Sequence, residues 1–97
     1  MSGRGAARLA LTLFTHRRCQ LCVDAKAALA EVRAEVPFEL SEVDIHKPGN
    51  ERWLEEYKHD VPVVHANGEF LLWHRVDVPR TIAQLRTLRD GGKVWPS

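Results

Sequence analysis

The sequence LALTLFTHRRCQLC, from Leu9 to Cys22, passes from an apolar run through a short polar stretch to a pair of cysteines. The apolar run from Leu9 to Phe14 alternates loosely, and this pattern predicts a buried strand. The polar residues Thr15 to Arg18 predict a turn. The pair Cys19-Gln20-Leu21-Cys22 therefore lies where a strand gives way to the next element.

The residues after the first cysteine show the spacing of one apolar helix face. Apolar side chains recur every three or four residues at Leu21, Ala25, Ala28, Leu29, Val32 and Val36. Pro37 should end this helix, because proline disfavours helical geometry in the residue before it.

The remaining chain is predicted to form five further elements in a regular order. They are a strand over 38–45, a short helix over 51–59, a strand over 61–64, a strand over 70–74, and a helix from about 77 to 89. Asn67-Gly68 predicts a tight hairpin between the last two strands. The order β-α-β-α-β-β-α implies a parallel first pair with a right-handed crossover and an antiparallel hairpin. We therefore expect an α/β fold with a mixed four-stranded sheet.

Length and composition exclude several classes of protein. The chain has 97 residues, 44% hydrophobic and 28% charged, with a formal net charge of +1. These values predict one soluble domain over 9–90, with tails at 1–8 and 91–97. The charges are spread along the chain, so no nucleic-acid partner is expected. No apolar stretch is long enough to span a membrane, and we expect an intracellular protein, cytoplasmic or, as an alternative, mitochondrial.

Cys19 and Cys22 are the candidate catalytic residues. Cys19 is expected at the start of a helix, where unpaired N–H groups and the helix dipole favour a thiolate, and Arg17 adds positive charge. Cys22, one turn into the helix, should be more buried. This asymmetry suits a nucleophile and a resolving thiol in disulfide exchange. The alternatives are two inert buried thiols, or zinc, for which only His16 could add a third ligand.

Val61-Pro62 is the second informative pair. Proline cannot donate a hydrogen bond to a sheet, so Pro62 should lie at an edge or a bend. The sequence itself allows a trans bond or a cis bond next to the cysteines.

In their order and spacing, these motifs resemble the thioredoxin superfamily and, within it, a group of glutaredoxin-like proteins. The resemblance covers about residues 9–90. It is carried by Leu13-Phe14-Thr15, Cys19 to Cys22 with Asp24, Val43-Asp44-Ile45, Tyr57-Lys58, Val61-Pro62-Val63, Asn67-Gly68 and His74-Arg75-Val76.

The resemblance implies a role for each matching position. Cys19 would be the nucleophile and Cys22 the resolving thiol. Pro62 would be a cis-proline packed against Cys19, and the backbone of Val61 would pair with glutathione or a peptide. Glutaredoxins often have a Gly-Gly step after the fourth strand, where this chain has Trp73 to Asp77. Arg75 could nevertheless meet a carboxylate there.

The leading hypothesis is a monomeric thiol-disulfide oxidoreductase that acts on protein or glutathione-mixed disulfides. No tightly bound cofactor or metal is expected, and glutathione would serve as co-substrate. One alternative is a non-enzymatic binding or redox-sensing module, suggested by Gln20, Leu21 and the missing glycines. Another is an iron–sulfur carrier in which Cys19 of two chains and glutathione bind the cluster.

Overall fold

The computed structural model describes residues 8–96 and contains seven elements in the predicted order. They are β1 (Ala10–Thr15), α1 (Gln20–Glu35), β2 (Glu39–Asp44), α2 (Glu51–Tyr57), β3 (Val63–Ala66), β4 (Glu69–Trp73) and α3 (Val78–Arg89). The strands form one mixed sheet in the order β2-β1-β3-β4. The predicted α/β thioredoxin-type fold is therefore confirmed.

Strand β1 lies inside the sheet and sets its register. It pairs in parallel with β2, with Ala10 opposite Glu39, and antiparallel with β3, with Phe14 opposite Val63. The predicted hairpin joins β3 to β4, and both Asn67 and Gly68 have positive φ. The Asn67 side chain also accepts a hydrogen bond from the Ala10 N–H at 2.9 Å, which fastens the hairpin to β1.

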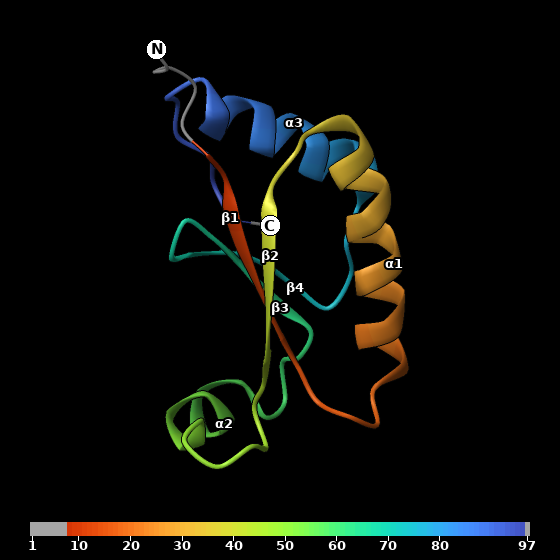
Figure 1. Cartoon of the computed structure of the whole chain (residues 1–97), viewed down its shortest axis with the longest axis vertical. Coiled ribbons are helices and arrows are strands. Elements are labelled where there is room, and N and C mark those ends of the chain that lie inside the picture. The colour runs from red at the N-terminus through yellow and green to blue at the C-terminus, as the bar shows by residue number, and fades with distance from the viewer. Residues whose placement is uncertain (1–7, 97) are drawn as a thin grey trace.

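The two faces of the sheet bury different side chains. One face carries the larger core, in which Leu11 and Leu13 of β1 pack with Leu29 and Val32 of α1 and with Leu85 of α3. On the other face, Phe14, Ile45 and Val63 are buried with residues of α2 around them. Figure 1 shows α1 and α3 together on one side and α2 apart from them at the lower left. The disulfide end of α1 lies at the same end of the sheet as α2.

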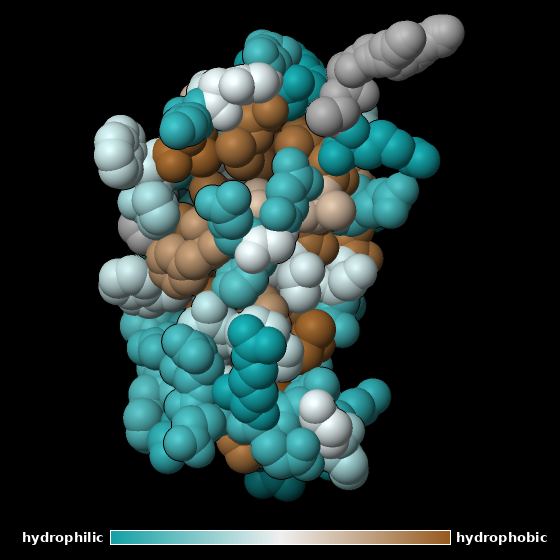
Figure 2. Space-filling model, turned by 90° about the vertical axis from the view of Figure 1, so that its left-hand side faces the viewer, coloured by the Kyte–Doolittle hydropathy of each residue, from teal (hydrophilic) through white to brown (hydrophobic). Residues whose placement is uncertain are grey.

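Seen from the α2 side, the surface divides by hydropathy (Figure 2). Its lower part, where α2 lies in Figure 1, is mostly hydrophilic, and its upper part shows more apolar side chains between polar ones. None of the helices within residues 8–96 is both long and apolar enough to cross a membrane.

The third strand and α2 differ by two residues from the bounds predicted from the sequence, whereas the other strands and α3 differ by one. The third strand begins at Val63 instead of Val61 and continues to Ala66, because Pro62 has no N–H with which to start the ladder. Helix α2 ends at Tyr57 instead of His59, with Lys58 as its C-cap. Val61 and Pro62 therefore belong to the loop that enters the strand.

The segment after α3 packs back on that helix. Val94 lies against the larger core, and the Gln84 side chain donates a hydrogen bond to the Trp95 carbonyl at 3.1 Å. The Trp95 side chain itself is 87% exposed. At the other end, most of the predicted tail 1–8 lies outside the described residues.

Candidate functional site

Cys19 and Cys22 form a disulfide at the start of α1, with their Cα atoms 5.1 Å apart. Cys19 is the N-cap of the helix, and its sulfur accepts a hydrogen bond from the Cys22 N–H at 3.1 Å. Cys22 is only 4% exposed, whereas Cys19 is half-buried. The asymmetry predicted from the sequence is therefore present: one sulfur is reachable from solvent, and the other lies behind it.

The surroundings of Cys19 favour a negatively charged sulfur. The first turn of α1 contains no acidic side chain. No carboxylate there offsets the positive end of the helix dipole, which lies next to the Cys19 sulfur. Asp24 lies further along, exposed, and accepts a hydrogen bond from the Gln20 side chain at 3.0 Å. Lys26 pairs with Glu42 of β2 at 2.9 Å, and not with Asp24.

The Val61–Pro62 peptide bond is cis, as the resemblance implies. Val61 is buried in the same cluster as Cys22 and Phe14, and Cys19 packs against that cluster. The Pro62 carbonyl accepts a hydrogen bond from the His74 N–H at 2.6 Å, which ties this loop to the end of β4. Within residues 8–96, the backbone N–H and carbonyl of Val61 have no hydrogen-bond partner. These are the groups to which the resemblance assigns the pairing with an extended substrate.

An aromatic cluster lies on the face of the sheet that α2 covers, in the same buried group as Val61. The Phe14 ring lies 4.6 Å from Trp53, 5.2 Å from Tyr57 and 4.6 Å from His65, measured between ring centroids. The Tyr57 hydroxyl and His65 Nε2 form a hydrogen bond of 2.7 Å. Burial lowers the pKa of His65 and raises that of Tyr57, so both rings are favoured in their neutral forms. Nothing in the sequence linked Tyr57 to His65.

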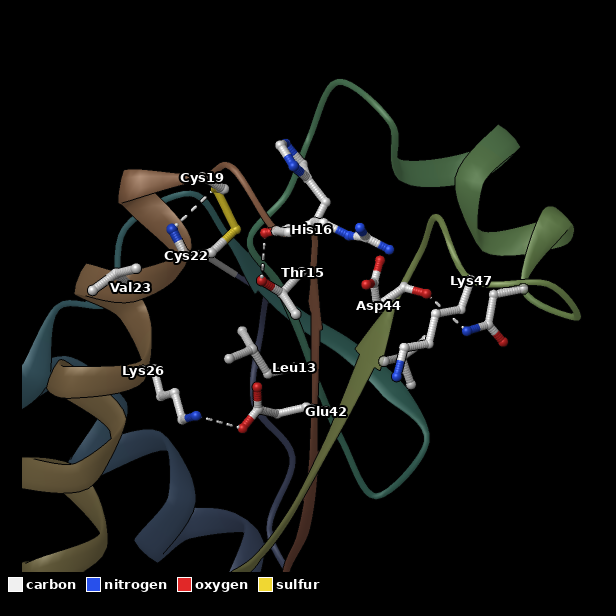
Figure 3. A pocket seen from close by; sticks show the side chains of 13 residues that line it. Leu13, Thr15, His16, Cys19, Cys22, Val23, Lys26, Glu42, Asp44 and Lys47 are labelled. Carbon is white, nitrogen blue, oxygen red and sulfur yellow. Dashed lines mark hydrogen bonds and ion pairs between the residues drawn. A yellow bond between two sulfur atoms is a disulfide. The ribbon is translucent and has the colours of Figure 1, made fainter.

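A cavity of about 610 Å³ opens next to the disulfide, between α1 and β2 (Figure 3). Both cysteines line it, together with Arg17, Lys26, Glu42, Asp44, Lys47 and neighbouring residues. Of the sequence-predicted site residues, Arg17 thus joins the cysteines here. Val61, Pro62 and Arg75 are not among the lining residues. Arg75 is exposed, just past the turn at His74.

No group of three or more histidine, cysteine or acidic side chains within residues 8–96 is placed to hold a metal ion. His16 Nδ1 instead accepts a hydrogen bond from the Arg18 N–H at 3.2 Å. Its ring lies edge-on to His46, with 5.3 Å between the centroids.

A tight turn follows β4 at the place where glutaredoxins often have glycines. His74 has φ of 65°, and the Arg75 N–H donates a hydrogen bond to the Trp73 carbonyl at 2.9 Å across it. This three-residue turn with positive φ is rare for a residue with a side chain. The backbone geometry that glycine would allow is therefore formed here by histidine.

Substitution at His74 should separate backbone strain from side-chain packing. Positive φ costs a non-glycine residue roughly 1–2 kcal/mol, and the entropic cost of glycine is roughly 0.5–1 kcal/mol. We expect His74→Gly to change the free energy of unfolding by less than about 1 kcal/mol, measured by urea denaturation. His74→Val should lower it by about 1–3 kcal/mol, because a β-branched side chain tolerates this conformation poorly. Equal losses in both variants would show that the imidazole holds the turn.

Comparison with known proteins agrees with this geometry. The family model described as glutaredoxin-like domain (DUF836) matches residues 10–86, which include the disulfide and the cis-proline. The chain belongs to the glutaredoxin-like family. A glutaredoxin-like protein of Dictyostelium discoideum, the YDR286C homolog, is 30% identical over 82 residues, covering 80% of this chain and 76% of that protein.

Two solved structures resemble this glutaredoxin-like chain. The X-ray structure of protein XcR50 from X. campestris is 31% identical, with a TM-score of 0.66 over 79% of this chain and 96% of the other. The solution structure of protein Ne2328 from Nitrosomonas europaea is 25% identical, with a TM-score of 0.67 over 82% of this chain and 96% of the other. Family membership and the cysteine pair together support a thiol redox role.

Proposed function

We propose that the protein is a thiol-disulfide oxidoreductase that reduces protein or glutathione-mixed disulfides. The observation that carries this proposal is the unequal placement of two cysteines that form a disulfide at a helix N-terminus. A redox-active pair must interconvert between dithiol and disulfide. Cys19 and Cys22 are three residues apart, within one helical turn, so their sulfurs are close enough to form and break this bond. Cys19 is half-buried and Cys22 is only 4% exposed, which favours Cys19 as the sulfur that a substrate meets first.

The reaction begins with the reduced protein. The Cys19 thiolate attacks one sulfur of the substrate disulfide and forms a mixed disulfide, and the other substrate sulfur leaves as a thiolate that takes up a proton. Cys22 then loses its proton and attacks Cys19. The second substrate thiol is released, and the Cys19–Cys22 disulfide forms. Two electrons have passed from the protein to the substrate, and two thiols such as glutathione would return them.

The local structure supports the first step. The Cys22 N–H that donates to the Cys19 sulfur in the disulfide form would donate to the thiolate in the reduced form. The unpaired backbone of Val61 could hold a peptide substrate beside Cys19 in extended form. The chemistry would therefore need no metal or other cofactor.

Turnover by the wild-type protein tests this proposal. A glutathione-mixed disulfide and a protein disulfide such as that of insulin would be supplied separately, with glutathione as reductant. We expect repeated turnover of at least one. Stoichiometric oxidation without turnover, in protein shown to be folded and reduced, would favour the alternative of a redox-sensing module.

A further inference from the structure

Three arginines from distant parts of the chain meet at the end of the sheet that is opposite the disulfide. Arg8 precedes β1, Arg33 lies in the last turn of α1, and Arg89 lies in the last turn of α3. All three line one hollow of about 490 Å³, which we call the arginine hollow. Figure 1 shows the starts of β1 and β2 and the last turns of α1 and α3 in the upper part of the molecule, with α2 at the other end.

Positive charge predominates in the arginine hollow. Among the described residues that line it, Glu39 is the only carboxylate, so three arginines and one glutamate leave a formal net charge of +2. Glu39 pairs with Arg8 at 3.4 Å, and both side chains are largely exposed. Arg33 forms no ion pair with any described residue, and Arg89 pairs through its Nε with the adjacent Asp90. Much of the positive charge therefore remains for a ligand.

The Arg33 side chain is positioned by an aromatic ring. The central carbon of its guanidinium lies 5.5 Å from the centroid of the Phe38 ring, within the reach of a cation–π contact. Phe38 is only 5% exposed and belongs to the larger core, so the ring itself is held in place. The Arg33 side chain donates no hydrogen bond to any of the described residues. Its guanidinium is therefore oriented before a ligand arrives, which lowers the entropic cost of binding.

Apolar side chains form the rest of the lining. They are Leu9, Pro37 and Phe38. Arg33 and Phe38 also line a second hollow of about 420 Å³ between α1 and β2, whose other lining residues are mostly apolar. Each hollow has the size that is usual for a small-ligand pocket, roughly 300–1,000 Å³. An anion bound between the arginines would therefore have apolar surface next to it for an attached organic group.

This combination of charge and apolar surface is complementary to one class of small molecule. We propose that the arginine hollow binds a small phosphate monoester with an apolar organic group, and that Arg8, Arg33 and Arg89 bind its phosphate. Such a phosphate carries a charge of about −1.5 to −2 at neutral pH and has three acceptor oxygens, which matches the net charge of the lining. Guanidinium groups bind phosphate oxygens through pairs of parallel hydrogen bonds. A carboxylate has less charge and fewer oxygens, so it would engage only part of the site.

The arginine hollow is independent of the proposed redox function. Neither cysteine lines it, and its residues come from the end of the sheet that lies away from α2. The same phosphate monoester should therefore bind equally well to the disulfide and to the dithiol form of the protein.

A role in helix stability alone would give a different set of results. Arg33 and Arg89 lie where the dipoles of their helices are negative, and a cation there stabilises the helix without any ligand. In that case the Arg33→Gln and Arg89→Gln variants would unfold at lower temperature and would not differ from wild type in binding. Arg8, which lies on no helix, would have no part in it.

Titration of the full chain with phenyl phosphate, followed by backbone amide NMR, tests the site. We expect saturable binding with the largest shifts at Arg8, Leu9, Phe38 and Arg89. Inorganic phosphate lacks the apolar ring, and benzoate lacks the second charge, so each should bind at least about fivefold more weakly. The absence of saturable binding, shifts confined to the residues around the disulfide, or equal affinity for benzoate would overturn the proposal.

Substitutions in the lining test the residues. Arg33→Gln and Arg89→Gln should each raise the Kd for phenyl phosphate about five- to tenfold, the loss expected for one exposed charge-assisted hydrogen bond. Glu39→Gln should lower this Kd about two- to fivefold, because it removes the carboxylate that competes for Arg8. Arg80→Gln is the matched control, because Arg80 is an exposed arginine in the first turn of α3, outside the lining.

Thermal unfolding of each variant without ligand completes the experiment. An unchanged Kd in both Arg33→Gln and Arg89→Gln would overturn the proposal, and a lower unfolding temperature in the same variants would assign these arginines to helix stability. An equal rise of the Kd in Arg80→Gln would also overturn it, because the binding would then follow the overall charge of the protein and not this hollow.

Discussion

Replacing Cys19 by serine should abolish disulfide reduction, with turnover reduced on the order of 10³-fold or more. A serine hydroxyl remains protonated at neutral pH and cannot displace a thiolate, so no mixed disulfide forms. Cys19 is the more accessible member of the pair and the N-cap of α1, and the other of the two cysteines of the chain, Cys22, is buried. The measurement is steady-state turnover of the glutathione-mixed disulfide and of insulin. Serine is itself a good N-cap residue, so the helix should remain intact.

Cys22→Ser is the matched control for this experiment, since it removes the other sulfur by the same substitution. The first attack by Cys19 remains, but the intramolecular resolving step is lost. Reduction of a protein disulfide should therefore stop at a mixed disulfide, visible as a mass increase. A second glutathione can still resolve a glutathione-mixed disulfide, so that activity should survive in part. Full activity of Cys19→Ser, or an equal loss of activity towards the glutathione-mixed disulfide in both variants, would contradict the assigned roles.

Leu29→Ala should strongly destabilise the fold. Leu29 is fully buried in the larger core, where α1 meets the sheet and α3. Truncating a buried leucine costs about 2–5 kcal/mol through lost burial and the cavity left behind. Small domains have only about 5–15 kcal/mol of total stability. We expect thermal unfolding to occur roughly 10 °C lower or more, measured by circular dichroism.

Two valines on the same helix provide an internal control. Val32 is fully buried, and Val23 is 61% exposed. Val32→Ala should cost about 1.5–3 kcal/mol, the value of burying a valine side chain, while Val23→Ala should stay within about 0.5 kcal/mol. Similar losses in the two variants would contradict the dominance of core packing, because alanine has a higher helix propensity than valine and the exposed substitution alone should not destabilise α1.

The sequence by itself determined the order of elements and the chemistry. Apolar spacing is set by the periods of helix and strand, so it located the face of α1 that is now buried at Ala25, Leu29 and Val32. Asn67-Gly68 predicted the hairpin, because both positions need the positive φ that these residues tolerate. The cysteine pair at a strand-to-helix junction predicted a redox centre. These are local properties, carried by residues close together in the chain.

Only the tertiary structure decided which distant residues share the site. The sequence offered both Arg17, next to Cys19, and Arg75, after the fourth strand, as basic residues that could bind a substrate. The fold puts Arg17 in the cavity and leaves Arg75 outside its lining. The sheet order β2-β1-β3-β4 brings three pairs of residues into contact. They are Lys26 with Glu42, Tyr57 with His65, and Pro62 with His74. The residue type at a position says what a side chain can bind. Sheet order and helix packing, which no local pattern encodes, determine what it can reach.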